Sequence, residues 1–211
     1  MNVLPKIAAT ALAVLLLASC GKTAGDASKN ATTSSSPSAA ASDPASAAPS
    51  STAAPASGKA MTGTGYSYNL PSAWDDITSQ LKSNQPSIDT GGRAKPPTPP
   101  FTANMNTLTT PSKISGDPSN ADLDALAAQI KGEVATIAPS IVTKPHFSIA
   151  GAPAVHQEGA ANSSGTKFYL VQYFAVYKGD NYGITFAFPT STSAADRDKV
   201  VLPVLSSWKW S

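Results

Sequence analysis

The stretch Lys167–Phe188, KFYLVQYFAVYKGDNYGITFAF, decides the fold. Aromatic and β-branched residues fill both of its halves, and Gly179-Asp180-Asn181 between them is a turn sequence. The stretch therefore predicts a hairpin of two antiparallel strands, Lys167 to Lys178 and Tyr182 to Phe188. Successive strand residues point to opposite faces, so the aromatic side chains occupy both faces. The second face must be covered by helices or bind a partner.

One helix is predicted before this hairpin in the sequence and one after it. Because these helices can cover the second face of the hairpin, its aromatic residues are more consistent with a core than with a binding surface. Ser119 or Asn120 is an N-cap candidate for a helix over 122–138, which Pro139 ends. Its apolar residues share one helical face: Leu123, Leu126, Ala127, Ile130, Val134 and Ile137. Ser193 caps a second helix over 194–207, which Pro203 should kink or divide.

Shorter strands are predicted before the hairpin. Alternation over Tyr66–Leu70 predicts an opening strand, and Trp74 after Pro71 should pack over the sheet edge. A short helix over Ile77–Leu81 follows. Further strands are predicted over 147–149 and 154–158.

Residues 84–100, with two glycines and a proline cluster, are predicted to form a long loop. This loop is either a recognition surface or a disordered insertion. The strand that follows, Phe101–Leu108, should turn Met105 inward and Asn104 and Asn106 outward.

This order of elements predicts an α+β fold in which an antiparallel sheet is flanked by helices. Residues 62–211 have the length of one domain with one core. This segment contains eleven Lys and Arg against eleven Asp and Glu, so no basic face indicates nucleic-acid binding.

Few residues suggest chemistry. Nucleophile-elbow, phosphate-loop, zinc-protease and paired-cysteine motifs are absent from the sequence. His156 and Glu158, two apart on a predicted strand, share a face and could supply two metal ligands or form a solvated polar site. His146 could join them only through the fold. Asp75-Asp76 suits the first turn of a helix, and Ser163-Ser164 lie in a turn with no base nearby. We therefore predict no catalytic residue, metal or cofactor.

The amino-terminal segment is predicted to be a targeting signal followed by a linker. Leu17-Ala18-Ser19-Cys20 follows Lys6 and an apolar run too short to span a bilayer, and it resembles the lipobox of bacterial lipoproteins. The resemblance implies removal of residues 1–19 and acylation of Cys20, the only cysteine of the chain. Residues 20–61 are rich in Ala, Ser and Pro and are predicted to be a disordered linker.

Several local sequences together resemble a known fold family. Leu70-Pro71-Ser72-Ala73-Trp74, the turn Gly151-Ala152-Pro153-Ala154 and the ending Trp208-Lys209-Trp210 are similar to those of Mog1/PsbP-like domains. With Tyr169-Leu170-Val171-Gln172, the chain resembles the LpqN-type lipoproteins of actinobacterial envelopes. The resemblance implies an α/β/α sandwich and carries no catalytic residue.

These observations favour a non-catalytic binding or scaffolding module on the extracytoplasmic face of the cell membrane. Membrane lipid would hold it through acylated Cys20, and a protein of the envelope would be its partner. Two alternatives remain open. One is a small-molecule or lipid carrier, and the other is an envelope hydrolase built from His146, His156, Glu158 and the 84–100 loop.

Overall fold

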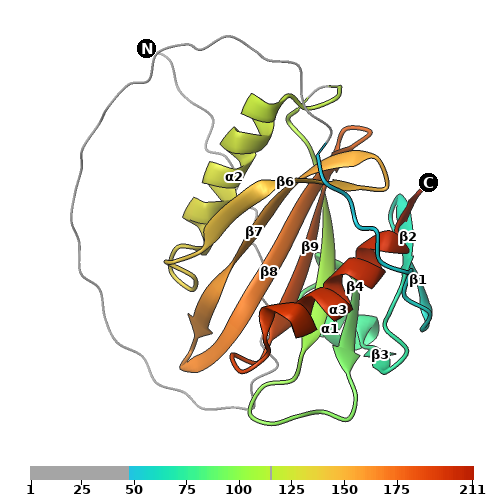
Figure 1. Cartoon of the computed structure of the whole chain (residues 1–211), viewed down its shortest axis with the longest axis vertical. Coiled ribbons are helices and arrows are strands. Elements are labelled where there is room, and N and C mark those ends of the chain that lie inside the picture. The colour runs from blue at the N-terminus through green and yellow to red at the C-terminus, as the bar shows by residue number, and fades with distance from the viewer. Residues whose placement is uncertain (1–47, 115) are drawn as a thin grey trace.

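The computed structural model describes residues 48–114 and 116–211, so the predicted signal peptide, Cys20 and most of the predicted linker lie outside the described residues (Figure 1). In chain order the elements are β1 (Ala60–Gly63), β2 (Tyr66–Asn69), β3 (Trp74–Asp76), α1 (Thr78–Asn84), β4 (Ile88–Ala94), β5 (Asn104–Pro111), α2 (Asn120–Val134), β6 (Val142–Ile149), β7 (Ala152–Ser163), β8 (Thr166–Tyr177), β9 (Asp180–Phe188), α3 (Ala194–Ser206) and β10 (Lys209–Trp210). Among these helices, none is long and apolar enough to cross a membrane.

The strands form two antiparallel sheets. The large sheet has the order β3-β4-β5-β9-β8-β7-β6, and the small one has the order β1-β2-β10. The predicted hairpin is confirmed as β8–β9, which pair from Tyr169↔Phe188 to Tyr177↔Asp180. Its turn is Lys178–Gly179 rather than the predicted Gly179–Asn181, because Asp180 and Asn181 already belong to β9. The φ values of Lys178 and Gly179 are 49° and 84°, and positive φ at both positions matches the twist of the flanking strands.

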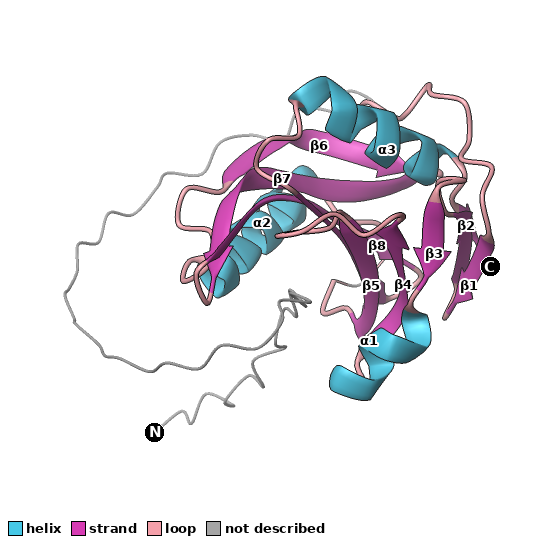
Figure 2. Ribbon diagram, turned by 90° about the horizontal axis from the view of Figure 1, so that it is seen from below, coloured by secondary structure: helices cyan, strands magenta, loops and turns pink. Residues whose placement is uncertain are grey.

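Helices cover both faces of the large sheet. Figure 2 shows α3 on one side and α1 and α2 on the other. Val201, Val204 and Leu205 of α3 pack in one cluster with Tyr173 and Phe186. On the opposite face, α2 packs against β7 and β8 and α1 packs against β4 and β5. The predicted α+β sandwich is therefore confirmed, and the hairpin aromatics form its core.

Both long helices begin where the sequence predicts. The Ser119 side chain accepts a hydrogen bond from the Asp122 backbone, and the Asp122 carboxylate accepts one from the Ser119 backbone, so α2 opens on a capping box. Ser193 caps α3 by accepting a hydrogen bond from the Asp196 backbone. Pro203 lies within α3 without dividing it.

The predicted loop over 84–100 is wrong over residues 88–94, which form strand β4. Gly91 and Gly92 belong to this strand rather than to a turn. A Cβ at Gly91 would collide with the Leu81 side chain of α1, and one at Gly92 would lie 2.5 Å from the Leu70 side chain. The glycines thus allow close packing on both faces of an edge region. The loop that remains is residues 95–103, and a recognition role for it stays a prediction.

The polar residues of β5 also differ from the prediction. Asn104 and Asn106 were expected to face solvent, but they are only 7% and 2% exposed. Alternation placed Met105 correctly in the core. It could not show that helices cover the other face of the sheet as well, so that both sets of side chains are buried.

The packed domain begins before the predicted boundary at residue 62. Ala56 and Met61 are buried, and the Ala56 backbone donates to the Pro203 carbonyl at 2.9 Å. The Ser51 hydroxyl donates to the Leu202 carbonyl of α3 at 3.0 Å. Backbone and hydroxyl hydrogen bonds attach this Ala/Ser/Pro-rich segment to the domain, although it has few apolar side chains to bury.

The outer strands of the large sheet are irregular. In β6 the register shifts between Lys144 and Phe147, with Pro145 between them. Next to this irregularity, Ser50 forms a parallel bridge with Ser148. At the other edge, β3 has only three residues, Trp74–Asp76.

Candidate functional site

The predicted pair His156 and Glu158 lies on one face of β7, as expected. This is the face that α3 covers, because Ala154, two residues earlier, packs in the α3 cluster. The Glu158 carboxylate forms an ion pair with Lys144 of β6 at 2.6 Å, and this hydrogen bond raises the pKa of Lys144. The carboxylate is therefore already neutralised by a lysine from the neighbouring strand.

The His156 ring is packed rather than presented to solvent. It stacks on Tyr173 with 4.3 Å between ring centroids and 12° between planes. Its Nε2 atom is buried and lacks a hydrogen-bond partner within the described part of the chain. Burial lowers the pKa of His156 to about 4, with a smaller contribution from the Lys144 charge, while Glu158 acts in the opposite direction. The ring is neutral at physiological pH.

His146 does not join this pair. Its Nε2 lies 3.0 Å from Asp124 Oδ1 and its Nδ1 lies 3.3 Å from Asn120 Oδ1, both on α2. The two histidines therefore face opposite sides of the sheet. Across the described ranges, no three His, Cys, Asp or Glu side chains gather as metal ligands would.

The adjacent carboxylates and the turn serines have structural contacts. Asp75 and Asp76 lie in β3 rather than in a helical turn, and each pairs with a lysine, Lys95 and Lys59, at 2.7 and 2.8 Å. Burial raises the pKa of Asp76, but hydrogen bonds from Lys59 and Thr78 outweigh this effect and hold the pKa below its usual value. Ser163 ends β7, and Ser164 with φ of 49° forms the turn into β8.

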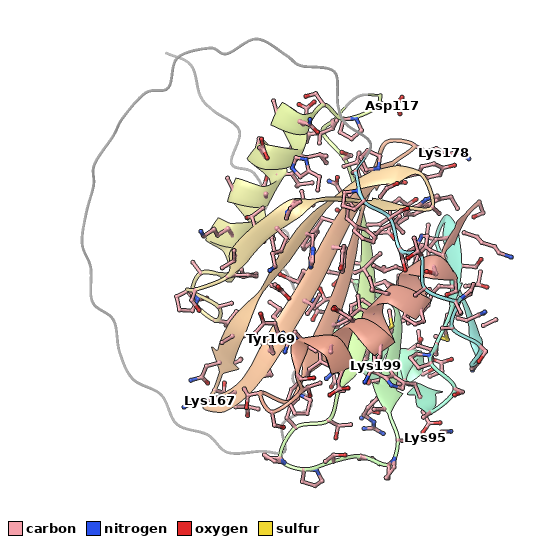
Figure 3. All side chains as sticks on the ribbon, in the orientation of Figure 1. Lys95, Asp117, Lys167, Tyr169, Lys178 and Lys199 are labelled. Carbon is pink, nitrogen blue, oxygen red and sulfur yellow. The ribbon has the colours of Figure 1, made fainter. Side chains whose placement is uncertain are left out.

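Aromatic residues near the start of α3 are also engaged. Arg197 lies over the Tyr169 ring at 3.6 Å and donates to the Thr192 carbonyl at 2.6 Å. Figure 3 shows Tyr169 beside the first turns of α3, on the sheet face that this helix covers. At Tyr169, therefore, the hairpin does not present an open aromatic patch to a partner.

The other sheet face holds a feature that the sequence did not reveal, which we call the amide row. Neighbouring strands place the following residues directly opposite one another: Gly91, Asn106, Thr185, Gln172, Gln157 and Thr143. The row thus crosses six strands from β4 to β6 and contains no charged side chain. Its inner members Asn106, Thr185, Gln172 and Gln157 are at most 3% exposed.

The hydrogen bonds of the amide row are incomplete. Gln157 Nε2 donates to the Ala127 carbonyl of α2 at 2.7 Å and to Thr143 Oγ1 at 3.2 Å, and Gln172 Nε2 donates to Thr185 Oγ1 at 3.1 Å. Within the described residues, no donor reaches Asn106 Oδ1, Gln157 Oε1 or Gln172 Oε1. Exchanging oxygen and nitrogen in an amide would leave a nitrogen unpaired instead.

Unpaired buried oxygens are costly. Each loses its hydration without a replacement, at about 1–3 kcal/mol. Native proteins pair most such groups with protein or with ordered water. Among the described residues, the amide row gathers three such oxygens on one sheet face and is therefore a candidate for binding a molecule that donates hydrogen bonds.

The amide row lies between the two helices of its face. Its β4 end, Gly91, contacts Leu81 of α1, and its β7 member Gln157 contacts Ala127 of α2. Figure 2 shows these helices over opposite ends of the sheet. The only sequence sign of the row is Gln172, which interrupts an otherwise apolar strand.

Comparison with known proteins supports the fold and nothing narrower. No family model and no curated protein matches the sequence. The chain is similar to the solution structure of cyanobacterial PsbP (CyanoP) from Synechocystis sp. PCC 6803, with a TM-score of 0.50 and 13% identity, over 72% of this chain and 92% of that one. It also aligns with a protein from Bacteroides thetaiotaomicron VPI-5482 at a TM-score of 0.44 and 13% identity, over 69% of this chain but only 45% of that one. The described domain has a Mog1/PsbP-like fold.

Proposed function

We propose that this chain is an LpqN-type lipoprotein, held on the extracytoplasmic face of the cell membrane by acylated Cys20, whose folded domain is a non-catalytic binding module. The lipobox sequence Leu17–Cys20 supports the anchor. The local sequences that resemble LpqN-type proteins support the narrower family, and the envelope supplies the partner.

One observation carries the non-catalytic part of the proposal. The candidate acid–base groups are turned apart or already paired: His146 and His156 face opposite sides of the sheet, and Glu158 is bound to Lys144. General acid–base chemistry needs such groups to converge on one reacting atom. This separation supports a binding role over the hydrolase alternative, which would need His146, His156 and Glu158 to act together with the 84–100 loop.

The anchor and the partner are tested with one pair of strains. Tagged full-length chain and its Cys20→Ala variant are fractionated and crosslinked in the cell, and captured proteins are identified by mass spectrometry. We expect the wild type in the membrane fraction with a discrete partner set that is lost in Cys20→Ala. Ser19→Ala, which keeps a small residue before the cysteine, should behave as the wild type.

Two results would contradict the proposal. Absence of an acyl group on Cys20 of the wild-type chain, by mass spectrometry, would reject the lipid anchor. An anchored wild type that captures no protein would reject the scaffolding role.

Carriage of a small molecule is the second candidate, and the amide row favours it. Its three unpaired oxygens could receive donors from a bound molecule. Native mass spectrometry of the wild-type chain purified from membranes tests this candidate, because a carried ligand would add mass that denaturation removes.

A further inference from the structure

We propose that the amide row is a water-binding site, in which a file of internal water molecules supplies the missing donors. The inference goes beyond the proposed function and holds whether or not the chain is anchored. The buried groups of the row that lack a partner among the described residues are all oxygens that accept hydrogen bonds: Asn106 Oδ1, Gln157 Oε1 and Gln172 Oε1. The amide nitrogens of both glutamines are already used within the fold.

The spacing of the row suits water. Adjacent strands lie about 4.8 Å apart, and a water that forms two hydrogen bonds bridges oxygens up to about 5.6 Å apart. One water can therefore join neighbouring members of the row. Asn106 on β5 and Gln157 on β7 are three strand steps apart, about 14 Å, so one water cannot serve all three oxygens. At least two waters are needed.

The surroundings of the row favour water over an ion or a charged ligand. No Asp, Glu, Lys, Arg or His belongs to the row, so nothing in it neutralises a charge. On one side the row adjoins Leu108, Gly183 and Phe174, and a Cβ at Gly183 would lie 3.1 Å from the Phe174 ring. Apolar packing at this distance excludes an occupant from that side of the row.

The row also has an end at the surface. Thr143 on the edge strand β6 is exposed, and its hydroxyl accepts a hydrogen bond from the fully buried Gln157. Polar groups therefore continue from solvent to the centre of the sheet face. We infer that internal waters exchange with bulk solvent through this Thr143 end.

Oxygen-17 relaxation dispersion of water, measured on the full chain, tests the inference because its amplitude counts long-lived internal waters. A folded domain of about 160 residues holds roughly six such waters. Gln172→Met removes one acceptor and keeps the side-chain length, so the amplitude should fall by at least one water. Gln80→Met, on the exposed face of α1, should leave it unchanged.

A second measurement needs no variant. The side-chain amide protons of Gln157 and Gln172 should show nuclear Overhauser effects to water with the sign of long-lived contacts. Absence of these effects, or equal dispersion in wild type and Gln172→Met, would overturn the inference. An organic molecule that adds mass to the purified wild type and is lost in Gln172→Met would also overturn it, in favour of carriage. The Cys20→Ala experiment is independent of all these outcomes.

Discussion

His156 should make the domain sensitive to mild acid. Burial lowers its pKa from 6.5 to about 4, so the folded chain resists a proton that the unfolded chain accepts. The stabilising effect of the neutral ring is complete above pH 6.5 and is lost as the pH falls from there toward 4. The full shift corresponds to about 3 kcal/mol, of which about 2 kcal/mol should be lost between pH 7 and pH 5.

Urea denaturation of the full-length chain at these two pH values measures this loss. A loss of about 2 kcal/mol lowers the urea midpoint by about 1 M, since m-values are about 1–3 kcal/mol/M. His156→Phe keeps a flat ring against Tyr173 and cannot bind a proton, so most of the pH dependence should disappear. His146→Gln, which removes the histidine on the opposite face, should keep it.

The test compares how much unfolding free energy each variant loses between pH 7 and pH 5. It is therefore independent of any change in stability that the His156→Phe substitution itself causes at pH 7. If His156→Phe loses as much stability as the wild type between pH 7 and pH 5, the reasoning is refuted. It is refuted equally if His146→Gln abolishes the acid sensitivity while His156→Phe preserves it.

Two further predictions concern packing and capping, and urea denaturation checks both. Gly159→Ala should lower the free energy of unfolding by about 2 kcal/mol, because the new Cβ would lie 2.8 Å from the Ile141 Cα. Gly132→Ala, whose Cβ would have no atom within 4 Å, should instead stabilise α2 by up to about 1 kcal/mol. Effects of the same sign in the two variants would contradict this contrast. Ser119→Ala should cost about 1 kcal/mol by removing the acceptor for the Asp122 backbone, and Ser119→Asn should restore most of it. An Ala variant as stable as wild type would show that the capping box contributes nothing.

The parts of the fold that the sequence predicted are those that local patterns determine. The β8–β9 hairpin joins two apolar runs through a turn of two residues, and α2 combines a serine cap with one apolar face. Strand β4 was missed because its glycines resemble a turn. These glycines instead let the Leu81 and Leu70 side chains approach the backbone of β4. Such contacts join different segments of the chain, so the local sequence does not reveal them.

The candidate site was predicted less well, for a related reason. His156 and Glu158 lie two apart on one strand, so their shared face followed from alternation alone. The fold then added Lys144 and Tyr173 from neighbouring strands, which turned a candidate metal site into an ion pair and a ring stack. The amide row depends on the pairing of six strands, and no sequence period could align Asn106 with Gln157.

The irregular edges of the large sheet have a consequence for crowded conditions. An edge strand with a full row of free backbone groups is a template on which a second chain can add a strand. Here β6 carries Pro145, which has no N–H, a register shift beside it and a bridge to Ser50, while β3 is only three residues long. Copies that meet at high concentration would find little continuous backbone at the edges of the large sheet, so this sheet resists extension into β-linked aggregates.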